Sequence, residues 1–207
     1  MDKHPNKFLL NGKMFDCQNG IYYPSEDSYL LAKNVKITKG IAIDVGCGSG
    51  IQTLNALMQG ADKAVAIDVN ENALLCTLEN AKKIGAEKKV TTLKSDLFEN
   101  YAGEKADTII FNPPYVPSDL DEAGEGSKKI KFVDLDGGKN GREVLDRFLA
   151  QFPRHLKKNG TCYFLQSDIN GYQKTEKKLA QKGLKFTRLS PRRQFFEELA
   201  VYKCAFQ

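Results

Sequence analysis

Short apolar strands alternate with amphipathic helices along most of this chain, and this alternation constrains the fold more than any other feature. It is typical of a parallel sheet that helices cover on both faces. The last two strands follow each other without a helix between them, so we expect an antiparallel pair at the edge of the sheet. The predicted strands are 41–45, 64–68, 90–95, 107–112, 160–166, 184–190 and 198–206, and the predicted helices are 25–35, 50–59, 70–84, 142–157 and 172–182.

Polar side chains stand at the carboxyl ends of the first four of these strands. They are Asp44, Asp68, Asp96 and Asn112. In open α/β sheets the carboxyl ends of parallel strands meet at one edge, and ligands bind there. We therefore expect these four side chains to share one pocket.

A glycine-rich turn follows the first of these strands and leads into a helical pattern. Its glycines, Gly46, Gly48 and Gly50, have the spacing G-x-G-x-G, whereas the third glycine of a dinucleotide fingerprint would stand at Ile51. Asp44 lies two residues before the first glycine, where a carboxylate would repel a pyrophosphate and suit a cationic amino-acid ligand. A structural role for Asp44, capping the turn, is the alternative. The turn thus predicts a ligand other than a dinucleotide.

The next two acidic positions suit a nucleoside. Asp68 stands 20 residues after Gly48, where its carboxylate can accept both hydroxyl groups of a ribose. It can also cap the helix that follows, and the two roles are compatible. Asp96 precedes Leu97, so a polar group for the edge of an adenine ring is followed by an apolar group for its face. The alternative for Asp96 is a plain turn residue.

The tetrapeptide Asn112-Pro113-Pro114-Tyr115 forms a stiff hook after an apolar strand. Proline lacks an N–H and fixes its own φ, and it pushes the preceding residue into extended geometry. The Asn112 oxygen and the Pro113 carbonyl can accept both hydrogens of a planar NH2 group, and Tyr115 can pack on its face. Taken alone, Asn112 could be a turn residue and Tyr115 a core aromatic. If a neighbouring site binds the donor of a chemical group, the hook predicts transfer of that group to a nitrogen.

These residues together resemble the class I S-adenosylmethionine-dependent methyltransferases. Within that class the chain resembles the HemK/PrmC family of protein glutamine methyltransferases, and in particular its short eukaryotic and archaeal branch. The resemblance covers roughly residues 20 to 206. The segments that carry it are Tyr23–Ser28, Asp44–Gly50, Asp68, Asp96–Leu97, Asn112–Tyr115, Gly137–Glu143 and the stretch with Arg193, Glu198 and Val201.

The resemblance implies a Rossmann-like class I methyltransferase domain, which we place at 21–207 after an N-terminal extension, 1–20. It implies S-adenosyl-L-methionine as the cofactor and no metal. Catalytic roles fall on Asn112, Pro113 and Tyr115, and substrate contacts on Asn112, Pro113, Pro114 and Tyr115. Cofactor contacts fall on Ser28, Asp44, Gly46, Gly48, Asp68, Asp96, Leu97 and Asn112. Ser28 lies in a segment that also reads as an ordinary helix start, with Ser25 as its N-cap.

The activity implied is methylation of the glutamine in the Gly-Gly-Gln motif of a class I peptide-chain release factor. Bacterial members of the family carry an additional N-terminal helical domain that docks the release factor, and about 20 residues precede the core here. The short branch works with a small zinc-binding activator, so a heterodimer is implied, and strand 90–95 is a candidate edge for the partner. Methylation of the adenine amine in DNA or RNA, methylation of protein lysine, and a non-enzymatic cofactor-binding scaffold stay open as alternatives.

Composition and charge bear on the partners and the cellular location of the protein. The net charge of +5 indicates a solvated basic face, or else a patch facing nucleic acid around Arg188, Arg192, Arg193 and the lysines near 130. The five cysteines are scattered and form no C-x-x-C, so neither a zinc site nor a disulfide framework is predicted. With no apolar stretch of membrane-spanning length and no signal-peptide pattern, we expect a cytoplasmic protein. The long polar segment 116–141 is either a substrate lid, which we favour, or a passive insertion.

Overall fold

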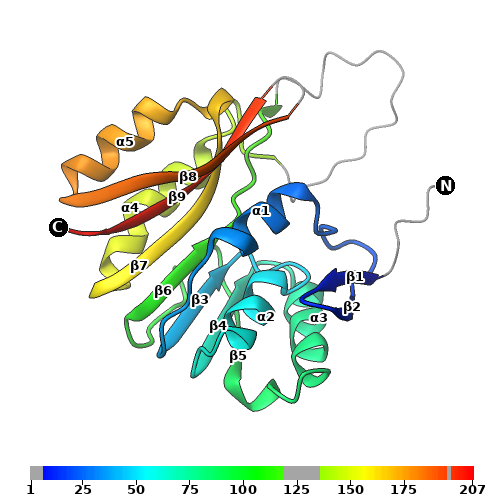
Figure 1. Cartoon of the computed structure of the whole chain (residues 1–207). Helices are drawn as coiled ribbons and strands as arrows, with labels where there is room; N and C mark the ends of the chain where they lie inside the picture. Colours follow the sequence, from blue (N-terminus) through cyan, green and yellow to red (C-terminus); the bar gives the residue numbers. More distant parts are fainter. Residues whose placement is uncertain (1–6, 119–135, 195–196) are drawn as a thin grey trace, which may run out of the picture.

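The computed structural model describes residues 7–118, 136–194 and 197–207 (Figure 1). Its main sheet has seven strands in the order β5-β4-β3-β6-β7-β9-β8. The strands are β3 (Ile41–Val45), β4 (Lys63–Asp68), β5 (Val90–Lys94), β6 (Ala106–Phe111), β7 (Leu156–Ser167), β8 (Leu184–Gln194) and β9 (Glu197–Phe206). The strands β5, β4, β3, β6 and β7 pair in parallel, while β9 pairs antiparallel with β7 and with the edge strand β8. The predicted fold class is confirmed.

Helices cover both faces of this sheet. One face carries α1 (Glu26–Asn34), α2 (Ile51–Met58) and α3 (Glu71–Lys82), and the other carries α4 (Glu143–Gln151) and α5 (Tyr172–Gln181). Successive side chains of a strand point to opposite faces. In β6 this sends Ile109 and Phe111 into the cluster beneath α4, and Ile110 into the cluster beneath α1. The next residue, Asn112, therefore turns toward α1.

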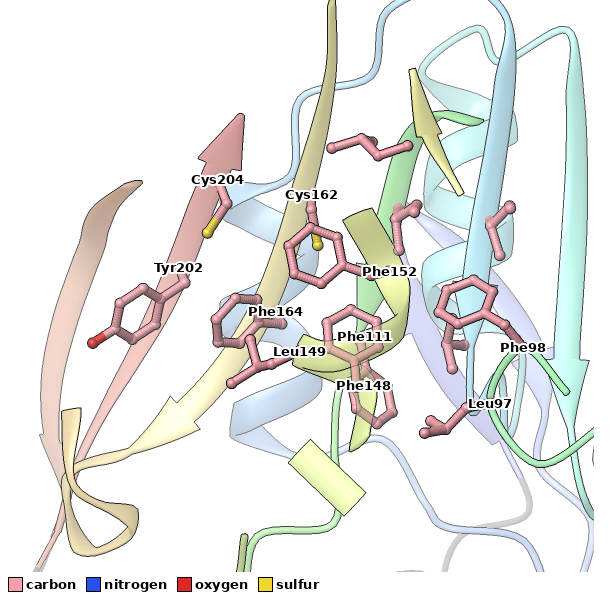
Figure 2. Close-up of a cluster of buried hydrophobic side chains, with 14 of the residues drawn as sticks. Leu97, Phe98, Phe111, Phe148, Leu149, Phe152, Cys162, Phe164, Tyr202 and Cys204 are labelled. Atoms are coloured by element: carbon pink, nitrogen blue, oxygen red, sulfur yellow. The ribbon is translucent and has the colours of Figure 1, made fainter. Parts of the chain in front are cut away.

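Aromatic rings fill the core between α4 and the sheet, as Figure 2 shows. The centroid of Phe148 on α4 lies 4.5 Å from that of Phe111 and 5.1 Å from that of Phe152. Farther along the sheet, Phe164 stacks on Tyr202 at 5.0 Å. Phe111 is the last residue of β6, so this packing fixes the strand end from which the Asn-Pro-Pro-Tyr hook leaves.

A β-hairpin precedes the main sheet and was not predicted. It consists of β1 (Lys7–Leu10) and β2 (Lys13–Asp16), and its buried side chains join a cluster with residues of α2 and α3. A sequence signal was available, because Asn11-Gly12 between apolar residues is a strong indication of a tight hairpin turn. Both turn residues have the positive φ that such a turn needs, 48° and 77°.

The predicted helix 142–157 is shorter in the structure. It ends at Gln151 and continues as a short 3₁₀ helix, Phe152–Arg154, which contains Pro153. Proline has no N–H to continue the α-helical ladder. The chain then enters β7 four residues earlier than the predicted start at 160, with Leu156 opposite Ala106.

Most of the predicted substrate lid, 119–135, lies outside the described residues. The two ends of the segment are joined by an isolated bridge between Val116 and Asp136 and by a hydrogen bond from the Gly137 N–H to the Val116 carbonyl. Nowhere in the described ranges does a helix combine the length and apolarity needed to cross a membrane.

Candidate active site

A pocket of about 350 Å³ opens at the carboxyl ends of β3, β4 and β6. That volume is in the range of small-molecule sites. Its lining includes nine of the residues predicted for the site: Ser28, Gly46, Gly48, Asp68, Asp96, Leu97, Asn112, Pro113 and Pro114. Asp44 and Tyr115, which were also predicted, are not among the lining residues.

The glycine-rich turn forms one wall of the pocket. Gly46, Gly48 and Gly50 have φ values of 64°, 51° and 85°, a region that other L-residues rarely adopt. A Cβ at Gly50 would also meet the Thr77 backbone and side chain within about 3 Å. The turn therefore needs glycine for its conformation and, at Gly50, for a close approach to α3.

Asp68 ties this turn to the end of β4. Its Oδ2 accepts a hydrogen bond from the Gly48 N–H and its Oδ1 accepts one from the Asn70 N–H, both at 2.9 Å. The N-cap of α3 is Asn70, whose side chain accepts from the Asn72 N–H at 3.0 Å. Asp68 is thus free of the capping role and lines the pocket at the position predicted for a ribose contact.

Asp44 lies beneath the turn. It is 2% exposed, and its Oδ2 accepts hydrogen bonds from the Thr53 N–H at 2.8 Å and from the Thr53 hydroxyl at 2.7 Å. These bonds hold the first turn of α2. Burial raises the pKa of Asp44 to about 7, although the two bonds from Thr53 act in the opposite direction.

The far end of the pocket carries Asp96, Leu97 and Arg147. Arg147 donates to Asp96 Oδ2 at 2.8 Å and to Glu99 Oε1 at 3.0 Å. Leu97 is buried and has a left-handed φ of 50°, a conformation that costs energy for a residue with a branched side chain. This strained turn brings a carboxylate and an apolar side chain to the same wall, and their contact with an adenine ring stays a prediction.

The hook begins with an amide whose orientation is fixed. Asn112 Nδ2 donates to Asp27 Oδ2 at 3.0 Å, and because a carboxylate only accepts, the nitrogen must face Asp27. The other amide atom, Asn112 Oδ1, is buried and has no hydrogen-bond partner among the described residues. A buried acceptor without a partner is costly, so it is expected where a ligand supplies the donor.

Asp27 is a site residue that the sequence analysis missed. It is 2% exposed, and its Oδ1 accepts from the Ser25 hydroxyl at 2.7 Å and from the Ser28 N–H at 2.5 Å. The Tyr22 hydroxyl donates to the same carboxylate at 3.0 Å. Asp27 stands in the quoted segment Tyr23–Ser28, but an acid in the first turn of a helix is already explained by the helix dipole. No local pattern indicated its contact with Asn112.

Tyr115 lies at the other end of the hook and is not among the residues that line the pocket. Its ring packs against the apolar cluster beneath α1. Burial, and then the charges of Asp27 and Glu197, raise its pKa well above the usual range. Its carbonyl accepts from Asn170 Nδ2 at 2.9 Å. Tyr115 therefore anchors the hook from outside the pocket in this structure.

The pocket as a whole offers acceptors. It has carboxylates at Asp68 and Asp96 and an amide oxygen without a partner at Asn112, and Arg147, the one cation among its described lining residues, is paired with Asp96. Such a lining suits a positively charged ligand that carries several hydrogen-bond donors. The hook at one end presents acceptors, and no general base, to a second ligand.

Comparison with known proteins gives a consistent set of relatives. The family model described as the methyltransferase small domain matches residues 24–124. A Methanocaldococcus jannaschii protein named as a protein N5-glutamine methyltransferase is 40% identical over 182 residues, which is 87% of this chain and 89% of that protein. Human methyltransferase HEMK2 is 32% identical, with 88% of each chain covered.

Among solved structures, the E. cuniculi Mtq2–Trm112 complex, described as responsible for methylation of the eRF1 translation termination factor, matches with a TM-score of 0.67. The sequence identity is 25%, and the match covers 91% of this chain and 99% of that chain.

Proposed function

This chain belongs to the HemK/PrmC family of S-adenosylmethionine-dependent protein methyltransferases, and from that premise we propose that it methylates the glutamine of the Gly-Gly-Gln motif in a class I release factor. The product is glutamine methylated on its side-chain nitrogen. The observation that carries this proposal is the amide oxygen of Asn112, which is buried, fixed in direction by Asp27 and without a partner among the described residues.

The pocket residues fit the family's cofactor. S-adenosyl-L-methionine, when bound, supplies an electrophilic methyl group on a positively charged sulfur. We propose that the carboxylates of Asp68 and Asp96 accept from its nucleoside, and that Gly46, Gly48 and Ser28 line its amino-acid end. The acceptor-rich lining compensates the ligand's positive charge, and the glycine turn lets the ligand approach the backbone closely.

The hook would hold the substrate amide. A carboxamide nitrogen is a weak nucleophile because its lone pair is delocalised, so accurate placement and stabilisation of developing charge contribute most. Asn112 Oδ1 and the Pro113 carbonyl accept hydrogen bonds from the two N–H groups of the substrate amide and direct its nitrogen toward the methyl group. As the new N–C bond forms and the C–S bond breaks, these oxygens stabilise the positive charge on nitrogen. One amide proton then leaves to water, and the neutral methylamide remains.

A partner is part of the proposal. We propose a small zinc-binding activator that pairs with the edge strand β5, in line with the two-protein complex of the E. cuniculi neighbour. Within the described residues, β5 pairs with another strand, β4, on one side only, and its residues Val90 and Leu93 are half-buried. The apolar side chains of Val69 and Leu75 are 59% and 57% exposed, and Leu75 belongs to α3, which packs beside β5. A cytoplasmic location accords with five cysteines that are all described and all buried free thiols.

The test is a methyl-transfer assay with labelled S-adenosylmethionine. It offers the release factor and its Gly-Gly-Gln→Gly-Gly-Ala variant, each with and without the candidate activator. Label on the wild-type factor alone, and only with the activator, is the expected result. Label without the activator would remove the partner proposal and leave the glutamine activity. No label on either factor, with cofactor binding demonstrated, would overturn the release-factor proposal and move the search to nucleic acid and basic peptides.

A further inference from the structure

Two side-chain amides of the pocket are held in the same way. Asn112 donates through Nδ2 to the Asp27 carboxylate, and Gln52 donates through Nε2 to the carbonyl oxygen of Ser28 at 2.8 Å. The two acceptors are neighbours at the start of α1. In both amides the oxygen is buried and has no partner in the described part of the chain. The start of α1 therefore orients two oxygen acceptors at once, and only one of them, that of Asn112, belongs to the substrate hook.

Gln52 belongs to the cofactor side of the pocket. It lies in the first turn of α2, directly after the glycine-rich turn, and it lines the pocket although it is only 3% exposed. A carbonyl oxygen can only accept, so the bond to Ser28 requires Nε2 on that side and leaves Oε1 on the other. A buried amide oxygen without a donor costs free energy that a bound ligand with an N–H or O–H group would recover.

The donor groups of the cofactor are its ammonium, its ribose hydroxyls and its adenine amine. Asp68 and Asp96 stand at the ends of β4 and β5 for the nucleoside, whereas Gln52 stands between α1 and the glycine turn. The carboxylate expected to meet the ammonium, Asp44, has its Oδ2 occupied by Thr53 beneath the turn. We propose that Gln52 Oε1 accepts a hydrogen bond from the ammonium group of S-adenosylmethionine and so selects for a cofactor with an intact amino-acid end. This inference rests on the family's cofactor and is independent of the methyl acceptor.

The alternative to this proposal is a purely structural role for Gln52, and another residue of the same helix serves as a control for it. Asn55, one turn later on α2, donates through Nδ2 to the Ala32 carbonyl of α1 at 2.9 Å. It ties the same two helices together by the same kind of bond, is 4% exposed, and is not among the pocket lining residues. Loss of the helix–helix bond affects both variants, whereas loss of an oxygen facing the ligand affects only Gln52.

The experiment measures binding by calorimetry in the absence of any methyl acceptor. The proteins are wild type, Gln52→Met, which keeps the length of the side chain, and Asn55→Leu. The ligands are S-adenosylhomocysteine and its analogue in which hydrogen replaces the amino group, and 5′-methylthioadenosine serves as a ligand without the amino-acid end. Circular dichroism and thermal unfolding show that each variant is folded.

A hydrogen bond to a charged group corresponds to roughly a tenfold or larger change in Kd. We expect Gln52→Met to raise the Kd of S-adenosylhomocysteine by about that factor. The Kd values of the two ligands without an ammonium should stay within about threefold of those of wild type. Asn55→Leu should leave the ratio of the Kd values of S-adenosylhomocysteine and its deaminated analogue unchanged. An equal loss for all three ligands in Gln52→Met would make its role structural. An unchanged Kd for S-adenosylhomocysteine would overturn the proposal outright. Either result leaves the release-factor activity to be judged by its own assay.

Discussion

The two halves of the pocket are built differently. Around the glycine-rich turn, the contacts that shape the site join residues close in sequence: Gly48 to Asp68 over 20 positions, and Thr53 to Asp44 over nine. On the acceptor half, Asn112 is held by Asp27 over 85 positions, and the Tyr115 carbonyl by Asn170 over 55. The glycine-rich turn and Asp68 can thus be assembled within the stretch β3-α2-β4, whereas the hook is oriented only when α1 and the segment before α5 are in place.

This difference predicts separable effects. Changes that loosen α1 or the segments around the hook should lower turnover more than cofactor affinity, because they misplace the acceptor oxygen while the glycine turn stays intact. The following variants test that separation.

The largest expected effect is that of Asn112→Ala. Loss of a transition-state hydrogen-bonding group of this kind costs about 100-fold or more in kcat. We expect that loss at saturating cofactor, with the Kd for S-adenosylhomocysteine close to that of wild type. The control is Asn100→Ala, which removes an amide that bonds the Lys94 carbonyl away from the pocket. Turnover of Asn112→Ala within a few-fold of wild type would remove the catalytic role.

Asp27→Asn tests whether the orientation of Asn112 matters. Ser25, Ser28, Tyr22 and Asn112 all donate to this carboxylate, so a carboxamide must turn its NH2 group toward at least one donor. We expect kcat to fall about tenfold or more, since leaving a buried polar group unsatisfied costs roughly 1–3 kcal/mol.

The matched change for Asp27→Asn is Asp62→Asn. Asp62 accepts a hydrogen bond from the Gly40 N–H at 2.9 Å, where the chain enters β4 and β3 at the amino ends of these strands. Steady-state kinetics together with cofactor titration distinguish the two variants. Equal kcat values for Asp27→Asn and Asp62→Asn would show that the acceptor half does not depend on α1.

Gly141→Ala tests the support of the hook from its other side. Gly141 has φ 63°, and a Cβ there would collide with the Tyr115 carbonyl oxygen and the Asn170 amide nitrogen. Gly183 has nearly the same φ, 67°, and no atom of the described residues would lie within 4 Å of a Cβ there. The free energy of unfolding of both alanine variants should fall by about 1–2 kcal/mol, because alanine is strained in the left-handed backbone conformation.

Only Gly141→Ala should also lower kcat, by several-fold, because only there must the hook move. Urea unfolding gives the stability of each variant, and the methyl-transfer assay gives its turnover. A parallel loss of turnover in Gly183→Ala would mean that general destabilisation, and not displacement of the hook, explains the effect.

The last prediction concerns Asp44 and the pH dependence of stability. Its pKa is about 7 in the folded protein against an ordinary value of 3.8, so between these values the folded state holds a proton that the unfolded state has released. Stability from this group therefore falls as pH rises from about 4 to about 7 and is flat beyond. In Asp44→Asn, which keeps an oxygen for Thr53, that decrease should be absent. Urea unfolding at pH 5 and pH 8 compares the two, and identical pH dependences would contradict the assignment.

Local patterns were enough to place the elements of the sheet. Apolar runs and helical periodicity located the seven strands and four of the five α-helices of the main domain to within a few residues. They failed at 142–157, where Pro153 ends the α-helix, and the Asn11-Gly12 signal of the N-terminal hairpin was overlooked. Strand-end polar residues also predicted one shared pocket, and Asp68, Asp96 and Asn112 do line it.

The sequence by itself thus determined the element order, the strand ends that carry polar groups, and the family. The tertiary structure alone decided which atoms are available. It buried Asp44 under α2, packed Tyr115 against the apolar cluster beneath α1, and brought Asp27 to Asn112 and Ser28 to Gln52. Periodicity reports the face on which a side chain lies, because it follows from local backbone geometry. The partner of each polar atom depends on packing between segments distant in sequence, and in the described residues that packing left the amide oxygens of Asn112 and Gln52 without a donor.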